Sequence, residues 1–545
     1  MRKLAAVLAI SVLFIAAGVG LASCGSSESG GKEGGTLIGT FSGFPDYLDP
    51  ALSYTAEGWT AMYDTYIPLL TYAHAGGEAG SKVVPGLATS MPKISNGGKT
   101  YTLMLTKGLK YSDGTPIKAS DFRFAVERMI QLNSGGSPFY TSIVGAEEFQ
   151  KTKKGPIPGI KTDDKTGEIV INLTEPRGTF NNELGLMFVA PLPPNTPIKN
   201  LSADPPPASG PYEIVSSDPG SGWKYERNPE WLKNNSKLLP ELPSGHLDKI
   251  DIKIVRNTAT QVSEVERGTT QWMQALIPPG LYQQTVNKFK GTQLREEPGT
   301  PNVYYFWMNM TRAPFNNLKV RQAVNYAVSS EALERIYAGS LKQLRQVLPE
   351  GIPGHKTFDL YPYNMAKAKE LIAEAKPSDT NITVWTDSEP TQEEAGAYYQ
   401  DQLKKLGFNS KLKIINPDDY FTIIGNKTTP DLDTGWVDWY QDYPHPNDFF
   451  QPLLAGESIL PTNNNNFANI NDPKLNAKIA KLRSEQLGPE QEAEYSELDR
   501  EYMEQAPWAP YGQRTLTTFV SSEIDLDKII FNPTFGQDLT SFQFK

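Results

Sequence analysis

The chain has 545 residues, of which 39% are hydrophobic and 21% charged, so we expect two or three globular lobes instead of one core. The net charge is −10 and no long run of lysine and arginine is present, which argues against nucleic acid as a partner. Since Cys24 is the single cysteine, no internal disulfide holds the lobes together.

The N-terminus has the pattern of a secretory signal. Basic Arg2-Lys3 precedes the apolar run 4–21, and Leu21-Ala22-Ser23-Cys24 resembles the lipobox of bacterial lipoproteins. We expect residues 1–23 to be removed, Cys24 to be lipidated at the cell membrane, and residues 24–35 to form a flexible tether. The alternatives are an ordinary signal peptide and a transmembrane anchor.

The first half of the chain mixes short strands with helices. Residues 36–41 alternate as a strand does, and residues 59–70 carry apolar side chains at helical spacing. Ser120 is expected to cap a helix, and residues 191–211, with eight prolines, are expected to cross between lobes. Further expected elements are strands at Tyr101–Thr106, Ile169–Leu173, Tyr212–Ser216, Trp223–Arg227 and Lys249–Val255, and a helix at Ala259–Arg267.

The second half contains a strand-helix-strand unit. Asn381–Thr386, Glu393–Leu406 and Ser410–Ile415 predict parallel strands with a right-handed crossover. Mixed with antiparallel hairpins, this unit predicts an α/β chain in more than one lobe. The other expected elements are strands at Tyr304–Met310 and Thr515–Val520, and helices at Leu318–Val328, Glu331–Ala338, from Asn364, from Asp472-Pro473 and at Glu490–Gln505.

The stretch Gly435–Phe450 combines two tryptophans, two tyrosines, three aspartates and two prolines. The prolines lack N–H groups, so we expect irregular backbone with no helix. A carboxylate among aromatics is costly when buried, and such arrangements often mark functional sites. The alternative interpretation is an aromatic loop that covers a core edge.

No catalytic or metal-binding motif is visible. The four histidines are isolated from one another, and we find no nucleophile elbow, phosphate loop or dinucleotide fingerprint. We therefore expect no catalytic residue, no metal and no cofactor. A secreted hydrolase that uses two distant carboxylates is the alternative.

Several segments resemble one family in the same order. They are Leu48-Asp49-Pro50, Leu103–Phe122, Ser209–Tyr212, Glu226–Pro229 and Ala313–Ala327. They resemble the family 5 extracellular solute-binding proteins of ABC importers, the oligopeptide- and dipeptide-binding group. The resemblance implies a type II periplasmic-binding-protein-like α/β fold, bilobal, with three domains and a hinge between the lobes.

The resemblance also implies a division into domains, with domain I discontinuous and hinge strands near Asn302–Asn309 and Pro510–Thr518. The expected segments are domain I at 36–75, 196–300 and 511–545, domain II at 76–195, and domain III at 301–510.

Trp439-Tyr440-Gln441-Asp442-Tyr443 resembles a family motif whose aspartate pairs with the α-ammonium group of the ligand, so Asp442 is the expected ligand carboxylate. The backbone at Trp439 and Tyr440 is expected to pair with an extended peptide. His445 departs from the motif, and Glu393–Gly396 offers no arginine for the ligand carboxylate, which favours oligopeptides over dipeptides. Further residues in segments that line the cleft of relatives are Tyr54, Phe139, Tyr140 and Tyr511.

The implied function is that of a lipid-anchored, monomeric receptor that delivers peptides to ABC permease subunits in the membrane. Alternatives are the same fold with an oligosaccharide or a metal chelate as ligand, the hydrolase above, and a receptor or holdase without transport.

Overall fold

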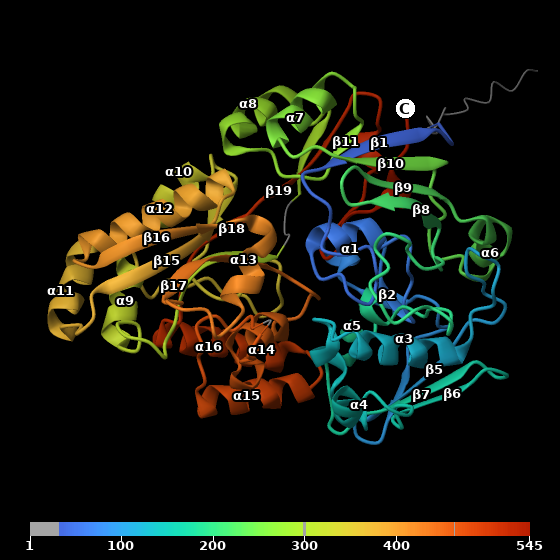
Figure 1. Cartoon of the computed structure of the whole chain (residues 1–545), viewed down its shortest axis with the longest axis horizontal. Coiled ribbons are helices and arrows are strands. Elements are labelled where there is room, and N and C mark those ends of the chain that lie inside the picture. The colour runs from blue at the N-terminus through green and yellow to red at the C-terminus, as the bar shows by residue number, and fades with distance from the viewer. Residues whose placement is uncertain (1–31, 298–300, 463) are drawn as a thin grey trace, which may run out of the picture.

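Two lobes with separate hydrophobic cores lie side by side (Figure 1). A computed structural model describes residues 32–297, 301–462 and 464–545. The expected signal, the lipidation site Cys24 and most of the tether lie outside the described residues.

The first lobe contains a seven-stranded sheet. Its central strand β1 (Thr36–Phe41) pairs in parallel with β10 and β11, and the outer pairs are antiparallel. The strand order is β12 (Leu294–Glu297), β19 (Leu516–Val520), β11 (Trp272–Met273), β1, β10 (Lys249–Ile254), β9 (Gly222–Arg227) and β8 (Tyr212–Asp218).

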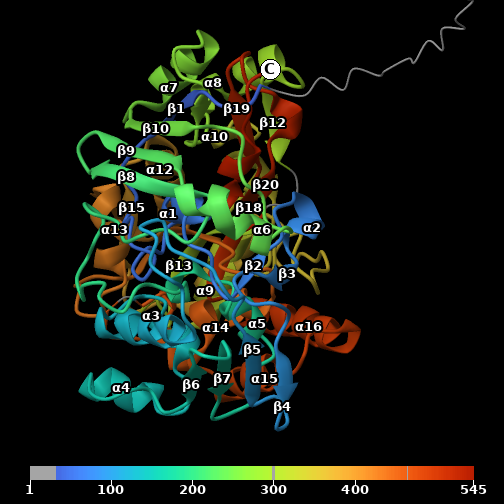
Figure 2. The same cartoon turned by 90° about the vertical axis from the view of Figure 1, so that its right-hand side faces the viewer.

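A four-stranded antiparallel sheet forms the other end of the first lobe (Figure 2). Its strands are, in order, β4 (Lys93–Ser95), β5 (Thr100–Met104), β7 (Glu168–Asn172) and β6 (Ile160–Asp163). Two further pairs of strands form separate two-stranded sheets: β2 (Leu70–Tyr72) with β3 (Val83–Pro85), and β20 (Phe531–Asn532) with β21 (Gly536–Gln537). The helices of this lobe are α1 (Ala56–Met62), α2 (Gly77–Gly80), α3 (Ala119–Gln131), α4 (Ala146–Thr152), α5 (Phe180–Glu183), α6 (Ser236–Leu238), α7 (Thr258–Glu266) and α8 (Pro279–Phe289).

The second lobe is built on a six-stranded sheet with helices around it (Figure 1). The strand order is β14 (Leu341–Gln343), β18 (Trp508–Arg514), β13 (Asn302–Met308), β17 (Thr434–Tyr440), β15 (Asn381–Asp387) and β16 (Asn409–Ile415). The helices are α9 (Leu318–Ala327), α10 (Ser330–Ile336), α11 (Met365–Ala375), α12 (Pro390–Lys405), α13 (Pro417–Ile424), α14 (Asn447–Leu454), α15 (Pro473–Ser484) and α16 (Pro489–Gln505).

The chain passes between the two lobes twice. β12 of the first lobe is followed by β13 of the second, and β18 is followed by β19 after the single residue Thr515. Every residue of β13 is buried, because this strand pairs with β17 and β18 and both of its faces are covered. β18 is also buried along its whole length, so each passage between the lobes connects to a buried strand of the second sheet.

An ion pair inside the first lobe gives Leu48-Asp49-Pro50 a structural role. Both oxygens of Asp49 accept hydrogen bonds from Arg128 of α3, at 2.8 and 2.6 Å, and both side chains are fully buried. Arg128 also donates to the carbonyls of Pro197 and Lys199 in the proline-rich segment. The pair thus joins three distant segments, and its bidentate geometry compensates part of the desolvation cost of burying charge.

Most expected elements are confirmed within one or two residues. The strand-helix-strand unit is β15, α12 and β16, with parallel strands as expected. Asn317, Asn364 and Asp472 each accept a hydrogen bond from a first-turn amide of the helix they precede. These capping bonds lie within a few residues, so they are visible in the sequence.

Four expectations were wrong. The proline-rich residues 191–211 do not cross between the lobes, because Leu192 and Tyr212 at the two ends of this segment pack in the core of the first lobe. The helix expected at 59–70 ends at Met62, and the apolar residues that follow, including Tyr66, reach the core from a turn and an irregular segment that lead to β2. Ser120 lies inside α3, whose N-cap is Lys118. The stretch Gly435–Phe450 is largely regular, because strand β17 runs to Tyr440 and α14 begins at Asn447. Only the segment with the two prolines is irregular, as their missing donors require.

Candidate ligand site between the lobes

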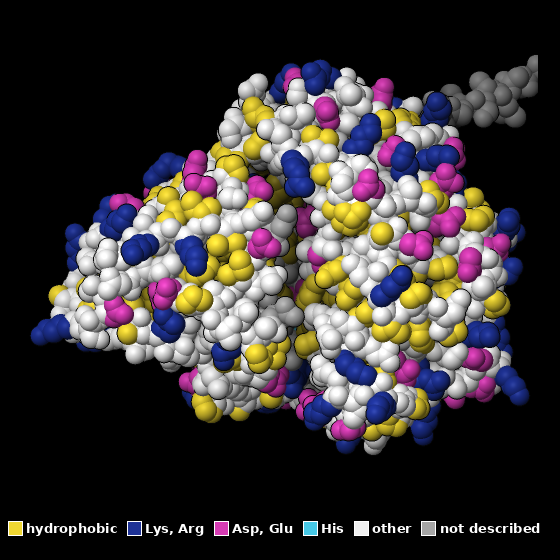
Figure 3. All heavy atoms as spheres, in the orientation of Figure 1, with side chains coloured by type: hydrophobic (Ala, Val, Ile, Leu, Met, Phe, Trp, Pro, Cys, Tyr) yellow, Lys and Arg dark blue, Asp and Glu magenta, His cyan; other side chains and the backbone are white. Residues whose placement is uncertain are grey.

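A groove separates the two lobes on the face shown in Figure 3, with acidic side chains at its edge. Inside it the lobes touch. The Tyr54 hydroxyl of the first lobe donates a 2.6 Å hydrogen bond to Oδ2 of Asp442, just past the end of β17. A second contact is the 3.0 Å bond that Gln441 Nε2 donates to Thr534 Oγ1. The structure is therefore a closed arrangement of the lobes.

Asp442 is buried without a cation. It is 6% exposed, and no lysine or arginine lies within 4 Å of its carboxylate among the described residues. Burial raises the pKa of Asp442 to about 7, although the hydrogen bond from Tyr54 and the contact with Asp448 act to lower it. A carboxylate held this way is stabilised by a cation that enters the groove.

Asp448 is a second buried carboxylate beside the first, and the sequence analysis missed it. Its Oδ2 accepts the backbone N–H of Asp442 at 2.8 Å and the indole N–H of Trp439 at 3.4 Å. Its Oδ1 is buried and has no hydrogen-bond partner. Burial, together with the nearby charge of Asp442, raises the pKa of Asp448 well above its usual range. The site thus concentrates negative charge where only protons or an incoming cation balance it.

The turn that holds the two carboxylates is fixed by local bonds. Nδ1 of His445 accepts the backbone N–H of Asn447 at 3.0 Å, which leads the chain into α14. His445 is buried, and burial lowers its pKa to about 3, so the imidazole is neutral at physiological pH. The residue that departs from the family motif therefore packs inside the turn and adds no charge to the site.

Aromatic rings surround the Tyr54–Asp442 contact. Tyr54 stacks on Trp59 with 5.9 Å between ring centroids and meets the edge of Phe188 at 5.2 Å. Phe139 contacts Tyr54 at 6.3 Å and Tyr443 at 6.0 Å. Since Tyr443 follows Asp442 directly and packs into the core of the first lobe, the closed arrangement buries aromatic surface from both sides.

One edge of β17 is available for strand pairing near the site. β17 pairs with β13 along its whole length, but with β15 only at Thr434 and Gly435. The Tyr420 hydroxyl donates to the carbonyl of Trp436 at 2.6 Å. Beyond that residue, the half-buried segment 438–440 has the geometry to add an extended peptide as a strand.

The structure brings four of the expected ligand-binding residues together: Asp442, Trp439, Tyr54 and Phe139. Tyr440 is half-buried on β17, and its hydroxyl lies 2.8 Å from that of Tyr304. Tyr140 and Tyr511 are fully buried in the two cores. The Tyr140 hydroxyl donates to the Glu183 carbonyl, and that of Tyr511 accepts from Trp436 Nε1. A ligand contact by these two residues stays a prediction.

Asp438 is a further acidic group that the sequence analysis passed over. It is half-buried on β17, and burial raises its pKa to about 6. A hydrogen bond from Tyr304 and the charge of Arg514 oppose this shift, and the charge of Glu57 reinforces it. Glu57 belongs to α1 of the first lobe. Alternation along β17 offered the signal, because Asp438 and Tyr440 share one face of the strand.

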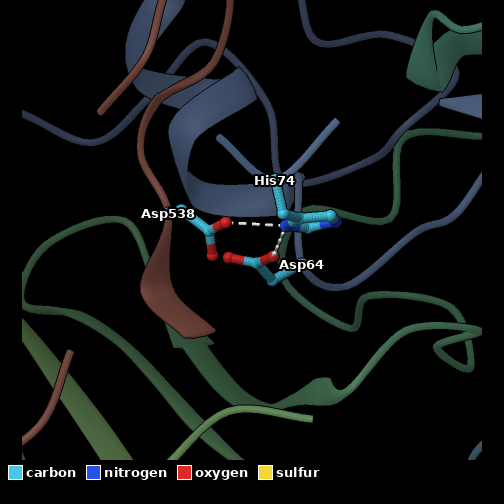
Figure 4. A group of neighbouring side chains, drawn as sticks. All are labelled: Asp64, His74 and Asp538. Atoms are coloured by element: carbon cyan, nitrogen blue, oxygen red, sulfur yellow. Dashed lines mark hydrogen bonds and ion pairs between the residues drawn. The ribbon is translucent and has the colours of Figure 1, made fainter. Parts of the chain in front are cut away.

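One cluster elsewhere has metal-binding residue types: Asp64, His74 and Asp538 (Figure 4). His74 Nδ1 lies 2.6 Å from Asp538 and 3.7 Å from Asp64. The shorter distance is that of a hydrogen bond and leaves no room for an ion between those two atoms. Asp64 also accepts the backbone N–H of Leu539 at 2.8 Å. The cluster therefore fastens the C-terminal segment to the first lobe.

Two lobes that touch across a buried, unpaired carboxylate define a solute-binding protein that encloses its ligand. The chain belongs to the bacterial extracellular solute-binding proteins, family 5, whose model matches residues 82–459. It is 27% identical to heme-binding protein A of Haemophilus influenzae over 92% of this chain and 93% of the relative. It is 24% identical to the probable D,D-dipeptide-binding periplasmic protein DdpA of Escherichia coli, covering 90% and 91%.

The fold is that of the type II periplasmic binding proteins. The solved structure of clavulanic acid biosynthesis oligopeptide binding protein 2 superimposes with a TM-score of 0.84 at 24% identity, covering 94% of this chain and 96% of the other.

None of the helices in the described part of the chain combines the length and apolar character needed to cross a membrane.

Proposed function

We propose that this protein captures peptides between its lobes and hands them to the permease of an ABC importer. The observation that carries the proposal is Asp442, a buried carboxylate at the lobe boundary without a cation among the described residues. A peptide α-ammonium group supplies the missing charge, and the open edge of β17 supplies backbone pairing that does not depend on side chains. Two relatives named for binding dipeptides and oligopeptides support this ligand class.

Further parts of the proposal rest on the sequence. The receptor is lipid-anchored through Cys24 on the outer side of the cell membrane, acts as a monomer and has no catalytic activity. Domain I comprises 36–75, 196–300 and 511–545, domain II 76–195 and domain III 301–510, with the hinge at the two crossings. Closure is then a population shift driven by contacts that exist only in the closed form.

The test is to identify what the purified protein carries. Native mass spectrometry followed by denaturation should release peptides, and titration calorimetry of the stripped protein should show binding of short peptides. Haem or a glycan as the released molecule, with no peptide binding in the titration, would contradict the proposal. Equal binding of N-acetylated and free-amine peptides would remove Asp442 from the site.

A further inference from the structure

Arg514 is a buried arginine without a direct ion pair, although its charge acts on Asp438 of the neighbouring β17. It is the last residue of β18 and is 7% exposed. No carboxylate lies within 4 Å of its guanidinium among the residues that the structure describes, and its Nε is buried without a hydrogen-bond partner. Of the other buried arginines, Arg128 pairs with Asp49 and Arg177 with Glu183, while Arg321 donates to two backbone carbonyls. An unpaired buried cation is costly, so its retention needs an explanation.

Arg514 shares a sheet face with residues of the proposed ligand site. Gly512 of β18 and Asp438 of β17 both lie opposite Tyr304 of β13. Arg514 lies two residues after Gly512, and Tyr440 lies two residues after Asp438. Because side chains alternate along a strand, Arg514, Tyr440, Asp438 and Tyr304 share one face of the sheet. The Tyr337 ring lies 5.4 Å below the guanidinium.

The surroundings keep Arg514 charged and place it. Burial alone would lower its pKa, but Tyr304, Tyr440 and Tyr337 outweigh burial and raise the pKa. Tyr304 also hydrogen-bonds the side chain. The Asn302 side chain bonds both backbone groups of Arg514, at 2.7 and 2.9 Å. A guanidinium positioned in this way presents donors that match a carboxylate.

We propose that Arg514 binds the carboxylate of a ligand whose amine pairs with Asp442, an inference that rests on the proposed function. The ligand is then a short zwitterionic peptide with a free C-terminus. β17 and β18 flank β13, so their residues are roughly 10 Å apart, while an extended chain advances about 3.3–3.6 Å per residue. A peptide of about three or four residues spans this distance if it crosses the sheet face from Asp442 toward Arg514, with only its N-terminal part beside the edge of β17.

The experiment compares alanine peptides of two to five residues, each as free acid, C-terminal amide and N-acetyl derivative, by calorimetry on the stripped full-length protein. The wild type should bind the best free acid at least about 30-fold more tightly than its amide, the cost of leaving a buried charge unpaired. In Arg514→Gln this acid preference should disappear, while the penalty for N-acetylation remains.

Arg321→Gln is the matched control, because Arg321 is also buried in the second lobe but donates to the carbonyls of Gln505 and Phe315. It should lower the melting temperature and leave the acid preference intact. Equal binding of acid and amide by the wild type, or an acid preference that survives in Arg514→Gln, overturns the role of Arg514 and leaves peptide binding standing. If the wild type binds no peptide at all, the proposed function is contradicted as well. If Arg514→Gln does not fold, the wild-type protein alone still tests the proposal, because equal binding of the acid and the amide overturns it.

Discussion

The Tyr54 hydroxyl donates a 2.6 Å hydrogen bond to the Asp442 carboxylate across the boundary of the two lobes, although 388 residues separate them in the sequence. The contact ties the closed arrangement to the group proposed to meet the ligand. A cationic ligand group that pairs with Asp442 therefore binds at a contact that joins the two lobes in the closed arrangement.

Replacing Asp442 with Asn should weaken the binding of a free-amine peptide by about 100-fold, because the ligand ammonium loses its buried counter-charge. Calorimetry measures this effect. Asp499→Asn is the control, since Asp499 is buried in the second lobe with a pKa near 7 and bonds the amides of Val347 and Leu348. The control should change the melting temperature and keep the affinity. An unchanged affinity in Asp442→Asn would exclude the carboxylate from the site.

Peptide affinity should depend on pH through Asp442. Its raised pKa of about 7 means that it is increasingly protonated below pH 7 in the closed, ligand-free protein. An ammonium ligand prefers the ionised carboxylate, so the affinity should fall as the pH drops from 7 to 5.5, a range in which the peptide amine is mostly protonated, with protons released on binding near pH 7. Titrations in buffers of different ionisation enthalpy count these protons. Flat affinity over this range, or proton uptake, would contradict the assignment.

Tyr54→Phe should shift the ligand-free protein toward an open form. The substitution keeps the aromatic packing against Trp59 and Phe188 but deletes the donor to Asp442. A hydrogen bond to a carboxylate contributes about 1.5–3 kcal/mol, enough to change the ratio of open to closed molecules at least about tenfold. Small-angle X-ray scattering should give a larger radius of gyration for the ligand-free variant, with both proteins equally compact at saturating peptide. Identical radii without ligand would show that other contacts hold the lobes.

The Asp49–Arg128 pair should be essential to the first lobe. Asp49→Ala leaves a buried guanidinium uncompensated and should lower the free energy of unfolding by about 3–5 kcal/mol. Chemical denaturation measures this value. The double variant Asp49→Ala with Arg128→Met should regain part of the loss, because no buried charge then remains. A loss under 1 kcal/mol in the single variant would mean that water reaches the pair.

Local elements could be predicted because their causes lie within a few residues. The caps Asn317, Asn364 and Asp472 bond amides two or three positions away, and the α12 unit shows its periodicity within one window. The helix expected at 59–70 failed because burial from several sides also produces apolar residues at helical spacing. Tyr66 is such a case, buried in the irregular segment that follows the turn after α1.

The sequence by itself determined the α/β class, the family resemblance and the choice of Asp442 as the candidate carboxylate. Only the tertiary structure decided that Tyr54 meets it, that Asp448 lies beside it, and that Arg514 is buried without a direct ion pair among the described residues. The reason is physical. Whether a charge is costly depends on its burial and its partners, and these are set by strands and loops that lie hundreds of residues apart.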